Sequence, residues 1–273
     1  QEIYWRVYWK GWLELRPKVW DDFTEDLNII KESENYYLAI EGQTKIECFN
    51  DWVKEIKEYN YLHNHARMWF ASIWIFTLGL PWQKGAEFFM KYLLDGDAAS
   101  NTLSWRWVGG LQTKGKHYLA QSWNISKFLN KKYQNIELRE NVLPLIDNRE
   151  YKISPIEIQK NNNKNEYLIV FENDLSIESL KIKNYKKIYF VLLDNKSRLL
   201  KLDSKVLNYK KNIIKDQINK INNSFVLINE NEIEELLENL KNFDIVYPSI
   251  GENMSFLKKM IKEKKLNLNF ITR

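Results

Sequence analysis

The sequence predicts two domains, an all-α domain over residues 1–150 and an α/β domain with a doubly wound parallel sheet over residues 166–273. All 11 Trp and all 3 His lie before residue 124, so the two halves differ in their chemistry. The polar run at 160–165 follows Pro144 and Pro155, and such segments mark irregular backbone. We therefore expect a linker over 151–165.

The first half has the periodicity of helices. We expect a helix over 1–15, ending near Pro17, because proline cannot continue a helix. Short amphipathic helices are expected over 51–60 and 83–94. The segment 63–78 is apolar on nearly all sides, which is typical of a central buried helix. Gly109 and Gly110 indicate a loop.

The second half alternates short apolar runs with helical patterns. Strands are expected over 167–171, 188–193, 225–228, 245–247 and 266–270, and helices over 200–222, 231–242 and 253–263. This alternation favours a parallel sheet covered on both faces. The turn after the first strand, residues 171–175, contains no glycine, which argues against a Rossmann dinucleotide site.

The composition excludes several classes of protein. With 44% hydrophobic and 28% charged residues, the chain is typical of globular proteins. No apolar run reaches the roughly 18 residues of a membrane span, and no secretory signal opens the chain. The single cysteine, Cys48, excludes an internal disulfide framework and fits a reducing cytoplasm. The histidines lack partners at ligand spacing, so we expect no metal.

The net charge of +5 is unevenly distributed. Residues 1–150 hold 19 Lys and Arg against 20 Asp and Glu, whereas residues 151–273 hold 22 against 16. The excess is scattered among asparagine and isoleucine in the second half. We interpret it as a solvated surface rather than a DNA footprint.

The most informative segment spans residues 61–107. It contains an H-N-x-x-R-M run, a D-G-D triplet, an asparagine four residues later and a W-x-W pair, namely His63, Asn64, Arg67, Met68, Asp95, Gly96, Asp97, Asn101, Trp105 and Trp107. Upstream lie Glu2, Trp5 and Arg6. These motifs and their spacing resemble the helical FAD-binding domain of the DNA photolyase and cryptochrome family over nearly the whole first half.

The resemblance implies a bent FAD as cofactor, contacted by Arg6, Asn64, Arg67, Asp95, Gly96, Asp97 and Asn101. It also implies that the Asn101 amide lies beside flavin N5, where asparagine is similar to photolyases and unlike the aspartate or cysteine of cryptochromes. Structural alternatives stay open. Arg67 and Asp95 can be a buried ion pair between helices, and Asp97 or Asn101 can be a helix cap.

The same resemblance implies UV-damaged DNA as partner, with a flipped pyrimidine dimer contacted by Glu2, Trp5, Asn64, His65, Met68 and Trp107. Aromatic side chains stack on bases with about 1–3 kcal/mol each, and extrusion is easier for a damaged pair. Trp5, Met68 and Trp107 can also be core residues.

Four residues are implied as catalytic, namely Glu2, Asn101, Trp82 and Trp105. Trp105 and Trp82 match the first two members of the family's electron-transfer chain. The third position is occupied by Ala39, and Tyr36, Tyr37 or Trp12 are candidates to replace it.

Several departures from the family pattern are present. The G-x-T-G-x-P segment lacks its second glycine and its proline at 42–47, and Tyr61 and His65 replace a tryptophan and an arginine. The T-S-x-L-S loop that holds the FAD phosphates does not occur. Because the chain opens at Gln1 inside a predicted helix, we expect an N-terminal portion to be missing. Asn64, where (6-4) photolyases carry a second histidine, favours cyclobutane dimers.

Residues 168–175 are similar to the first strand of the photolyase antenna domain, which usually precedes the flavin domain. Pigment binding and a purely structural role both stay open for this half. The expected function is light-driven DNA repair by a deoxyribodipyrimidine photolyase, a carbon–carbon lyase, acting as a monomer. The alternatives are a cryptochrome-like blue-light receptor without repair activity, and a fragment too short to hold FAD.

Overall fold

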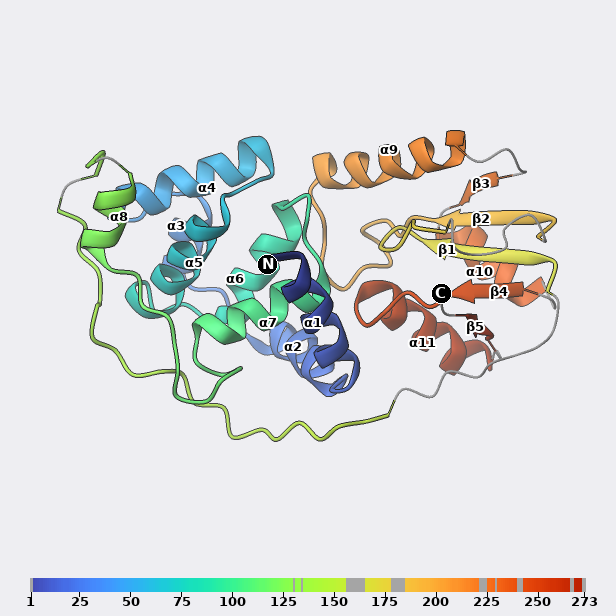
Figure 1. Ribbon diagram of the computed structural model, residues 1–273, viewed down its shortest axis with the longest axis horizontal. Helices are drawn as coiled ribbons and strands as arrows, with labels where there is room; N and C mark the ends of the chain where they lie inside the picture. The colour runs from blue at the N-terminus through green and yellow to red at the C-terminus, as the bar shows by residue number, and fades with distance from the viewer. Residues whose placement is uncertain are drawn as a thin grey trace. The chain divides into compact units, whose positions relative to one another are not determined.

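The computed structural model describes residues 2–129, 131–133, 135–155, 165–177, 185–220, 225–228, 230–239, 243–265 and 268–271, with side chains except at 2, 3, 225–228 and 230. Two compact units are present, Gln1–Lys152 and Ile153–Arg273 (Figure 1). Most of the predicted linker, 156–164, and the start of the strand expected over 266–270 lie outside the described residues.

The first unit is helical, as predicted. Its elements are α1 (Glu2–Glu14), α2 (Lys18–Ile29), α3 (Glu34–Ile40), α4 (Glu47–Tyr59), α5 (Asn64–Ser72), η1 (Ile73–Thr77), α6 (Trp82–Tyr92), α7 (Ala98–Val108) and α8 (Ser122–Phe128). The helix predicted over 63–78 is interrupted, because its last part, η1, is a π-helical turn. The predicted helix over 51–60 begins four residues earlier than expected.

An aromatic core fills the centre of this unit. Phe70 on α5 stacks on Phe49 of α4 with ring centroids 4.4 Å apart and on Phe88 of α6 at 5.9 Å. Trp74 in η1 and Trp105 on α7 meet edge to face at 6.2 Å. Both tryptophans are almost completely buried. The unusual number of aromatic residues in this half is therefore explained largely by packing.

Asn60 fixes the corner that positions two predicted site segments. It ends α4 in the left-handed conformation, with φ 56°, which asparagine tolerates better than most residues. Its side-chain amide donates to the Tyr92 carbonyl at 2.8 Å, and its own carbonyl accepts from Leu94 N–H at 3.0 Å. These bonds join the start of the α5 segment to the loop that carries Asp95.

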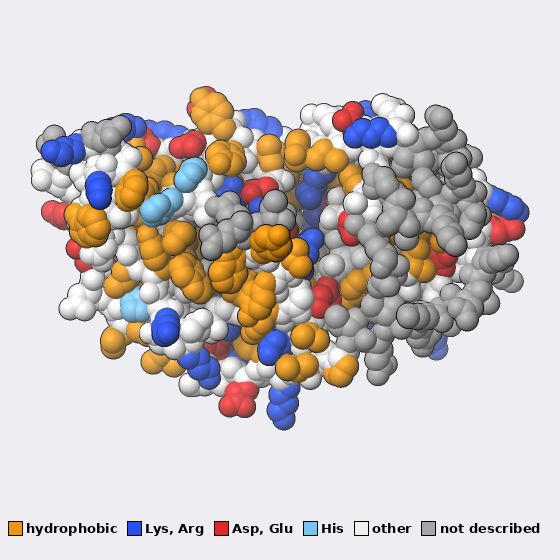
Figure 2. All heavy atoms as spheres, in the orientation of Figure 1, with side chains coloured by type: hydrophobic (Ala, Val, Ile, Leu, Met, Phe, Trp, Pro, Cys, Tyr) orange, Lys and Arg blue, Asp and Glu red, His pale blue; other side chains and the backbone are white. Residues whose placement is uncertain are grey.

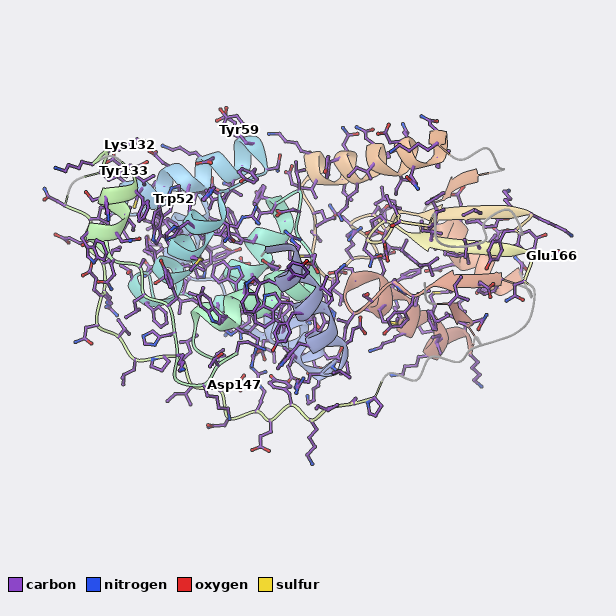
Figure 3. All side chains as sticks on the ribbon, in the orientation of Figure 1. Trp52, Tyr59, Lys132, Tyr133, Asp147 and Glu166 are labelled. Atoms are coloured by element: carbon purple, nitrogen blue, oxygen red, sulfur yellow. The ribbon has the colours of Figure 1, made fainter. Side chains whose placement is uncertain are left out.

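A second contact holds the segment after α8 against α4. The Tyr133 hydroxyl donates to Asp51 at 2.8 Å, and the Lys132 ammonium lies 3.0 Å from the same carboxylate oxygen (Figure 3). Both donors lower the pKa of Asp51, Lys132 more than Tyr133. None of the described helices is both long and apolar enough to cross a membrane.

The second unit contains a five-stranded parallel sheet in the order β3-β2-β1-β4-β5. Its elements are β1 (Tyr167–Phe171), β2 (Lys187–Val191), α9 (Ser204–Lys220), β3 (Phe225–Ile228), α10 (Glu230–Asn239), β4 (Phe243–Val246), α11 (Glu252–Lys264) and β5 (Phe270–Ile271). The parallel sheet agrees with the prediction, with strand bounds shifted by a few residues.

Both faces of the sheet are covered. Ile233 of α10 and Leu257 of α11 join one buried cluster with Ile169 and other residues of the strands. Ile214 of α9 packs against the opposite face, with Val170. Because strands buried on both faces are continuously apolar, this arrangement accounts for the sequence pattern of the second half.

Polar side chains of the chain itself occupy the carboxyl end of β1. Glu172 and Arg198 form an almost completely buried ion pair. Asn173 donates to the Pro248 carbonyl and accepts from the Asn253 amide at 2.9 Å. The glycine-free turn after β1 thus carries ordered polar contacts.

Candidate functional site

Three predicted cofactor residues from different elements form one ion-pair cluster. The Arg67 guanidinium on α5 donates to both carboxylate oxygens of Asp95, each at 3.0 Å. Arg6 on α1 donates to the same carboxylate at 2.7 Å and to the Asp95 backbone carbonyl at 3.1 Å. Arg67 is held in turn by its Nε–H, which donates to the Leu62 carbonyl at 2.7 Å.

This cluster sets the charge state of Asp95. Burial alone would raise the pKa of Asp95, but hydrogen bonds and charge from Arg67, followed by the charge of Arg6, lower it below the usual aspartate value. The carboxylate is therefore ionised at neutral pH. The fork-to-carboxylate geometry is the strong, directional form of the ion pair, and it orients the loop before α7.

The Asp97 side chain caps α7 with one carboxylate oxygen, and its other oxygen accepts no hydrogen bond from the described residues. Its Oδ1 accepts from the Ala99 N–H at 3.2 Å, which confirms the cap interpretation. Its Oδ2 is buried and accepts no hydrogen bond from the described residues, although Arg6 Nη1 lies 3.6 Å away. The Ser100 hydroxyl, three residues further along, is also buried without a described partner.

The unpartnered Asp97 Oδ2 and Ser100 Oγ atoms indicate whether the site fits FAD. Buried polar atoms in native proteins nearly always have a hydrogen-bond partner. An acceptor on Asp97 and a hydroxyl on Ser100, beside Asp95, fit the hydroxyl-rich chain of FAD. No group of three His, Cys, Asp or Glu side chains that could hold a metal ion occurs among the described residues.

Asn101 lies on α7 and is not a helix cap. Its side-chain N–H donates to the Ala86 carbonyl of α6 at 2.8 Å. This bond fixes the amide plane and leaves the Asn101 Oδ1 atom for another donor. Gly96 is also tightly placed, because a Cβ there would lie 3.1 Å from the Leu93 carbonyl oxygen.

The residues predicted to contact a flipped base lie on three helices. Trp5 on α1 is 52% exposed and stacks on Trp9 at 5.7 Å, so it is a surface residue and not a core residue. Trp107 on α7 is partly exposed and stacks on Tyr118 at 5.9 Å. Met68 is also partly exposed. The Glu2 side chain lies outside the described residues.

Asn64 and His65 lie in the first turn of α5. Asn64 is exposed. The His65 ring lies 4.3 Å from Trp69, and burial, followed by the charge of His63, lowers the pKa of His65. His65 therefore presents a neutral ring at physiological pH, in contrast to the arginine that the family carries there.

The two predicted electron-transfer tryptophans are buried in different surroundings. Trp105 contacts Phe89 at 5.1 Å and Trp74 at 6.2 Å, and its indole N–H has no acceptor among the described residues. Trp82 stacks on Phe23 at 5.4 Å, and the Arg106 guanidinium lies 5.8 Å from its ring.

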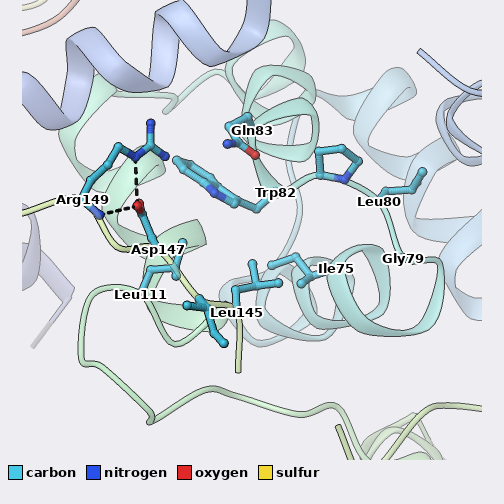
Figure 4. A pocket seen from close by; sticks show the side chains of 11 residues that line it. Ile75, Gly79, Leu80, Trp82, Gln83, Leu111, Leu145, Asp147 and Arg149 are labelled. Carbon is cyan, nitrogen blue, oxygen red and sulfur yellow. Dashed lines mark hydrogen bonds and ion pairs between the residues drawn. The ribbon is translucent and has the colours of Figure 1, made fainter. Parts of the chain in front are cut away.

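Trp82 also lines a cavity of about 370 Å³ (Figure 4). Its walls are apolar at Leu80 and Leu145 and polar at Asp147 and Arg149. Arg149 Nε donates to Asp147 at 2.9 Å. Of the predicted site residues, Trp82 alone lines this cavity, so the cavity is distinct from the Arg6–Asp95–Arg67 cluster.

The sequence interpretation missed a stretch of the chain, residues 98–136, that is rich in basic and aromatic residues and that we call the basic strip. It contains six Lys and Arg and no Asp or Glu. Trp123 and Phe128 on α8 are 61% and 57% exposed. Figure 2 shows hydrophobic side chains gathered on one face of the helical unit, with histidine and cationic side chains among them. Counting charged residues over about 40 positions at a time would have revealed this positive charge, whereas the net charge summed over residues 1–150 hides it.

Comparisons with known proteins agree with the motifs. A family model described as the FAD binding domain of DNA photolyase matches residues 1–183. A deoxyribodipyrimidine photo-lyase of Buchnera aphidicola subsp. Baizongia pistaciae is 30% identical over 128 residues, 43% of this chain and 26% of the relative. A protein of that name from Thermus thermophilus is 31% identical over 123 residues, 43% of this chain and 29% of the relative.

The protein of the same name from Escherichia coli K12 is 31% identical over 78 residues, 29% of this chain and 16% of the relative. No solved structure matched. The chain spans about a quarter of the length of the curated relatives it matches. The family model covers the whole helical unit and extends into the second unit, and the cofactor of the matched domain is FAD. The chain therefore belongs to the DNA photolyase family, through its FAD-binding domain.

Proposed function

We propose that this protein carries out light-driven DNA repair, splitting cyclobutane pyrimidine dimers with FAD. The observation that carries the proposal is the cluster of Arg6, Asp95 and Arg67. Three residues that the motifs single out, far apart in sequence, form a single ion-pair cluster. The cluster joins α1 and α5 to the loop after α6 and so orients the segment that carries Asp97 and Asn101.

In this proposal the helical residues 1–150 hold the cofactor. Asp97 Oδ2 and the Ser100 hydroxyl satisfy their hydrogen bonds on FAD, and Asn101 presents its amide oxygen toward the central ring. When bound and excited, reduced FAD supplies the electron that opens the cyclobutane ring and later returns. The residues of the chain orient FAD and the pyrimidine dimer relative to each other, and buried aromatic side chains exclude water from the space between them.

The basic strip supports DNA as the substrate. Two of its six cations, Arg106 and Lys132, are paired with aspartates from other segments. The exposed Lys114, Lys116 and Lys127 lie in a segment without an acid, and such side chains attract a phosphate backbone.

Exposed aromatic side chains on α1 and α8 add flat surfaces for bases. The exposed rings of Trp5, Trp123 and Phe128 offer flat surfaces on which unstacked bases can lie. Trp107, partly exposed and already stacked on Tyr118, is the proposed contact for the extruded dimer. Because His65 is neutral, we expect it to pack against a sugar or base instead of pairing with a phosphate.

The second unit, residues 166–273, is proposed to be an antenna-like module that follows the flavin domain. The parallel sheet covered on both faces supports this proposal. The Glu172–Arg198 ion pair and the Asn253–Asn173 hydrogen bond fill the carboxyl end of β1 with the chain's own side chains, although Glu172 Oε2 and Asn253 Oδ1 have no partner among the described residues.

The alternative is a flavin-binding photosensor without repair. The substitution of Tyr61 and His65 for family residues favours it. Both functions require the same cofactor residues, so FAD binding cannot separate them. Only repair of a dimer requires Trp107 to contact DNA.

The test begins with FAD titration of the purified chain, followed by flavin absorbance and fluorescence. The loaded protein is then photoreduced, mixed with an oligonucleotide containing a thymine dimer, and illuminated with blue light. We expect repaired thymines to accumulate, and Trp107→Ala to abolish repair while FAD stays bound. FAD binding with intact dimers in the unsubstituted protein would favour the sensor. No FAD binding would favour the third alternative, a fragment too short to hold FAD.

A further inference from the structure

A continuous row of aromatic rings leads from Trp105 to the protein surface by a route other than Trp82. Trp105 and Trp74 lie with ring centroids 6.2 Å apart, Trp74 and Tyr36 lie 6.0 Å apart, and Tyr36 and Tyr37 lie 5.4 Å apart. Each pair meets edge to face. Trp105 and Trp74 are buried, Tyr36 is half-buried, and Tyr37 is 52% exposed.

The far end of this row has a proton acceptor. The Tyr37 hydroxyl donates to Glu32 at 2.6 Å. A phenol loses its proton readily when it loses an electron, so a carboxylate at this distance allows both to leave together. The hydrogen bond raises the pKa of Tyr37 and lowers the pKa of Glu32, which keeps Glu32 ionised at neutral pH.

The near end of the row has no such acceptor. The Trp105 N–H is buried and lacks a partner among the described residues. An oxidised Trp105 therefore has no base to which it could lose its proton, and it stays a cation radical. Trp74 differs, because its N–H donates to the Pro81 carbonyl at 2.9 Å, and the carbonyl dipole stabilises positive charge on the ring. The vacancy is therefore expected to leave Trp105 for Trp74.

The branch through Trp82 ends differently. Trp82 stacks on Phe23, and a phenylalanine ring is much harder to oxidise than tyrosine or tryptophan. The position at which the family carries its third tryptophan is Ala39, which is completely buried. Beyond Phe23 this branch reaches Trp20 at 5.6 Å, and Trp20 is almost completely buried. An electron vacancy on Trp82 must therefore cross a phenylalanine ring to reach a buried tryptophan.

We propose that Trp74, Tyr36 and Tyr37 form the electron route between Trp105 and solvent, with Tyr37 as terminal donor and Glu32 as its proton acceptor. This inference rests on the proposed function, since the light-excited oxidised flavin is the oxidant that takes the electron from Trp105. Trp74 then refills Trp105, and Tyr37 refills Trp74 across the ring of Tyr36.

The step balances in electrons and protons. Tyr37 loses one electron to the row and its hydroxyl proton to Glu32, leaving a neutral tyrosyl radical and a protonated carboxyl. A thiolate in solution subsequently supplies one electron to the exposed Tyr37 ring. Glu32 returns the proton at that point, and the thiolate becomes a thiyl radical.

The test uses the full chain loaded with oxidised FAD, illuminated with blue light and frozen for electron paramagnetic resonance. We expect a tyrosyl spectrum in the unsubstituted protein. Tyr37→Phe removes it and leaves a tryptophanyl spectrum, and Trp74→Phe lowers both. Glu32→Gln keeps the ring contacts but removes the base, so tyrosyl formation slows by about 100-fold, the scale of a lost general base.

Tyr59→Phe is the matched control. Tyr59, near the end of α4 (Figure 3), is 64% exposed and is hydrogen-bonded to Glu58, as Tyr37 is to Glu32. Its substitution should leave the tyrosyl yield unchanged. An unchanged yield in Tyr37→Phe, or loss of the yield in Trp82→Phe but not in Trp74→Phe, would overturn the proposal.

A flavin-free version separates this inference from the proposed function. Ultraviolet flashes excite the tryptophans of the apo chain in the presence of a cobalt(III) ammine complex, which removes the electron irreversibly. Tyr37→Phe should lower the tyrosyl yield more than Tyr59→Phe does. Equal effects of the two substitutions would refute the route whether or not the chain binds FAD.

Discussion

Gly85 on α6 offers a sharp test of the packing around Trp105. A Cβ built on Gly85 would lie 2.2 Å from Trp105 Cη2 and 2.4 Å from Cζ3, far inside contact distance. Trp105 is 2% exposed and packs on Phe89, so its ring has little room to move. Gly85→Ala must therefore displace a rigid, buried indole.

The magnitude follows from two opposing effects. Overpacking of a well-packed core costs about 1–3 kcal/mol. Alanine is favoured over glycine inside a helix by about 0.8–1 kcal/mol. Because the contact is with the ring itself and not with a flexible end, we expect the packing cost to lie in the upper part of that range, at about 2–3 kcal/mol. The net loss in the free energy of unfolding should be about 1–2 kcal/mol.

The matched control is Gly11→Ala on α1. No atom lies within 4 Å of a Cβ built on Gly11, so this variant receives the helix gain without a clash. Urea unfolding followed by circular dichroism measures both. We expect Gly11→Ala to raise the midpoint and Gly85→Ala to lower it. If both raise it equally, Trp105 does not lie against α6 as described.

Three further predictions concern the Asp95 ion pairs, the burial of Cys48 and the left-handed residue Asn60. Asp95→Asn removes the charge shared by two arginines and should cost about 1–2 kcal/mol of stability at neutral pH, given the partial exposure. Since the folded pKa of Asp95 is lowered, its contribution is complete above about pH 3.9 and disappears as the pH falls through the folded value. Thermal unfolding curves of variant and unsubstituted protein should then converge in acid. Burial raises the pKa of Cys48 to about 12, so a thiol reagent at mildly alkaline pH should label Cys48 only as fast as the chain opens; rapid labelling of native protein would contradict its burial. Asn60→Ala loses the bond to Tyr92 and strains a left-handed residue, whereas Asn60→Gly loses the bond alone, so calorimetry should find alanine worse by about 1 kcal/mol.

The central strands β1, β2 and β4 could be predicted because nearly all of their residues are buried. Tyr167–Phe171 and Phe225–Ile228 have the predicted bounds, since an apolar run ends where the sheet ends. The strand over 245–247 was predicted two residues late, because Phe243 and Asp244 belong to β4. Asp244 interrupts the apolar run, and its partner Tyr185, which donates to it at 2.7 Å, comes from a distant part of the chain.

Several helices were not predicted, namely α2, α3, α7 and α8. Two of them have only seven residues, too few for a period to be recognised. The α7 sequence begins Ala-Ala-Ser-Asn-Thr and mixes polar with aromatic residues. Its helix depends on the Asp97 cap and on packing of Leu103 and Trp105 against neighbouring helices, and no local pattern reports such tertiary support.

Motif spacing identified the members of the ion-pair cluster as candidate site residues, but it could not predict their contacts. The motifs indicated Arg67, Asp95 and Asn101 because family spacing preserves their order along the chain. That Arg6 completes the same ion-pair cluster depends on how α1 packs, which the sequence does not encode locally. For the same reason, the sequence could not decide which of Tyr36, Tyr37 and Trp12 is the terminal aromatic donor, because their contacts depend on how the helices pack.

The Arg6–Asp95–Arg67 cluster, proposed to hold the cofactor, and the proposed electron route make separate demands on the same helical unit. Arg6, Arg67 and Asp95 lie on α1, α5 and the α6–α7 loop, whereas Glu32 and Tyr37 flank the start of α3. Well-separated substitutions act independently. Asp95→Asn should therefore change FAD affinity without altering the apo radical yield, and Glu32→Gln should do the reverse. A single substitution that changed both the FAD affinity and the radical yield would indicate a structural effect on the whole helical unit. Measuring both quantities in Asp95→Asn and Glu32→Gln therefore distinguishes loss of one function from loss of the fold.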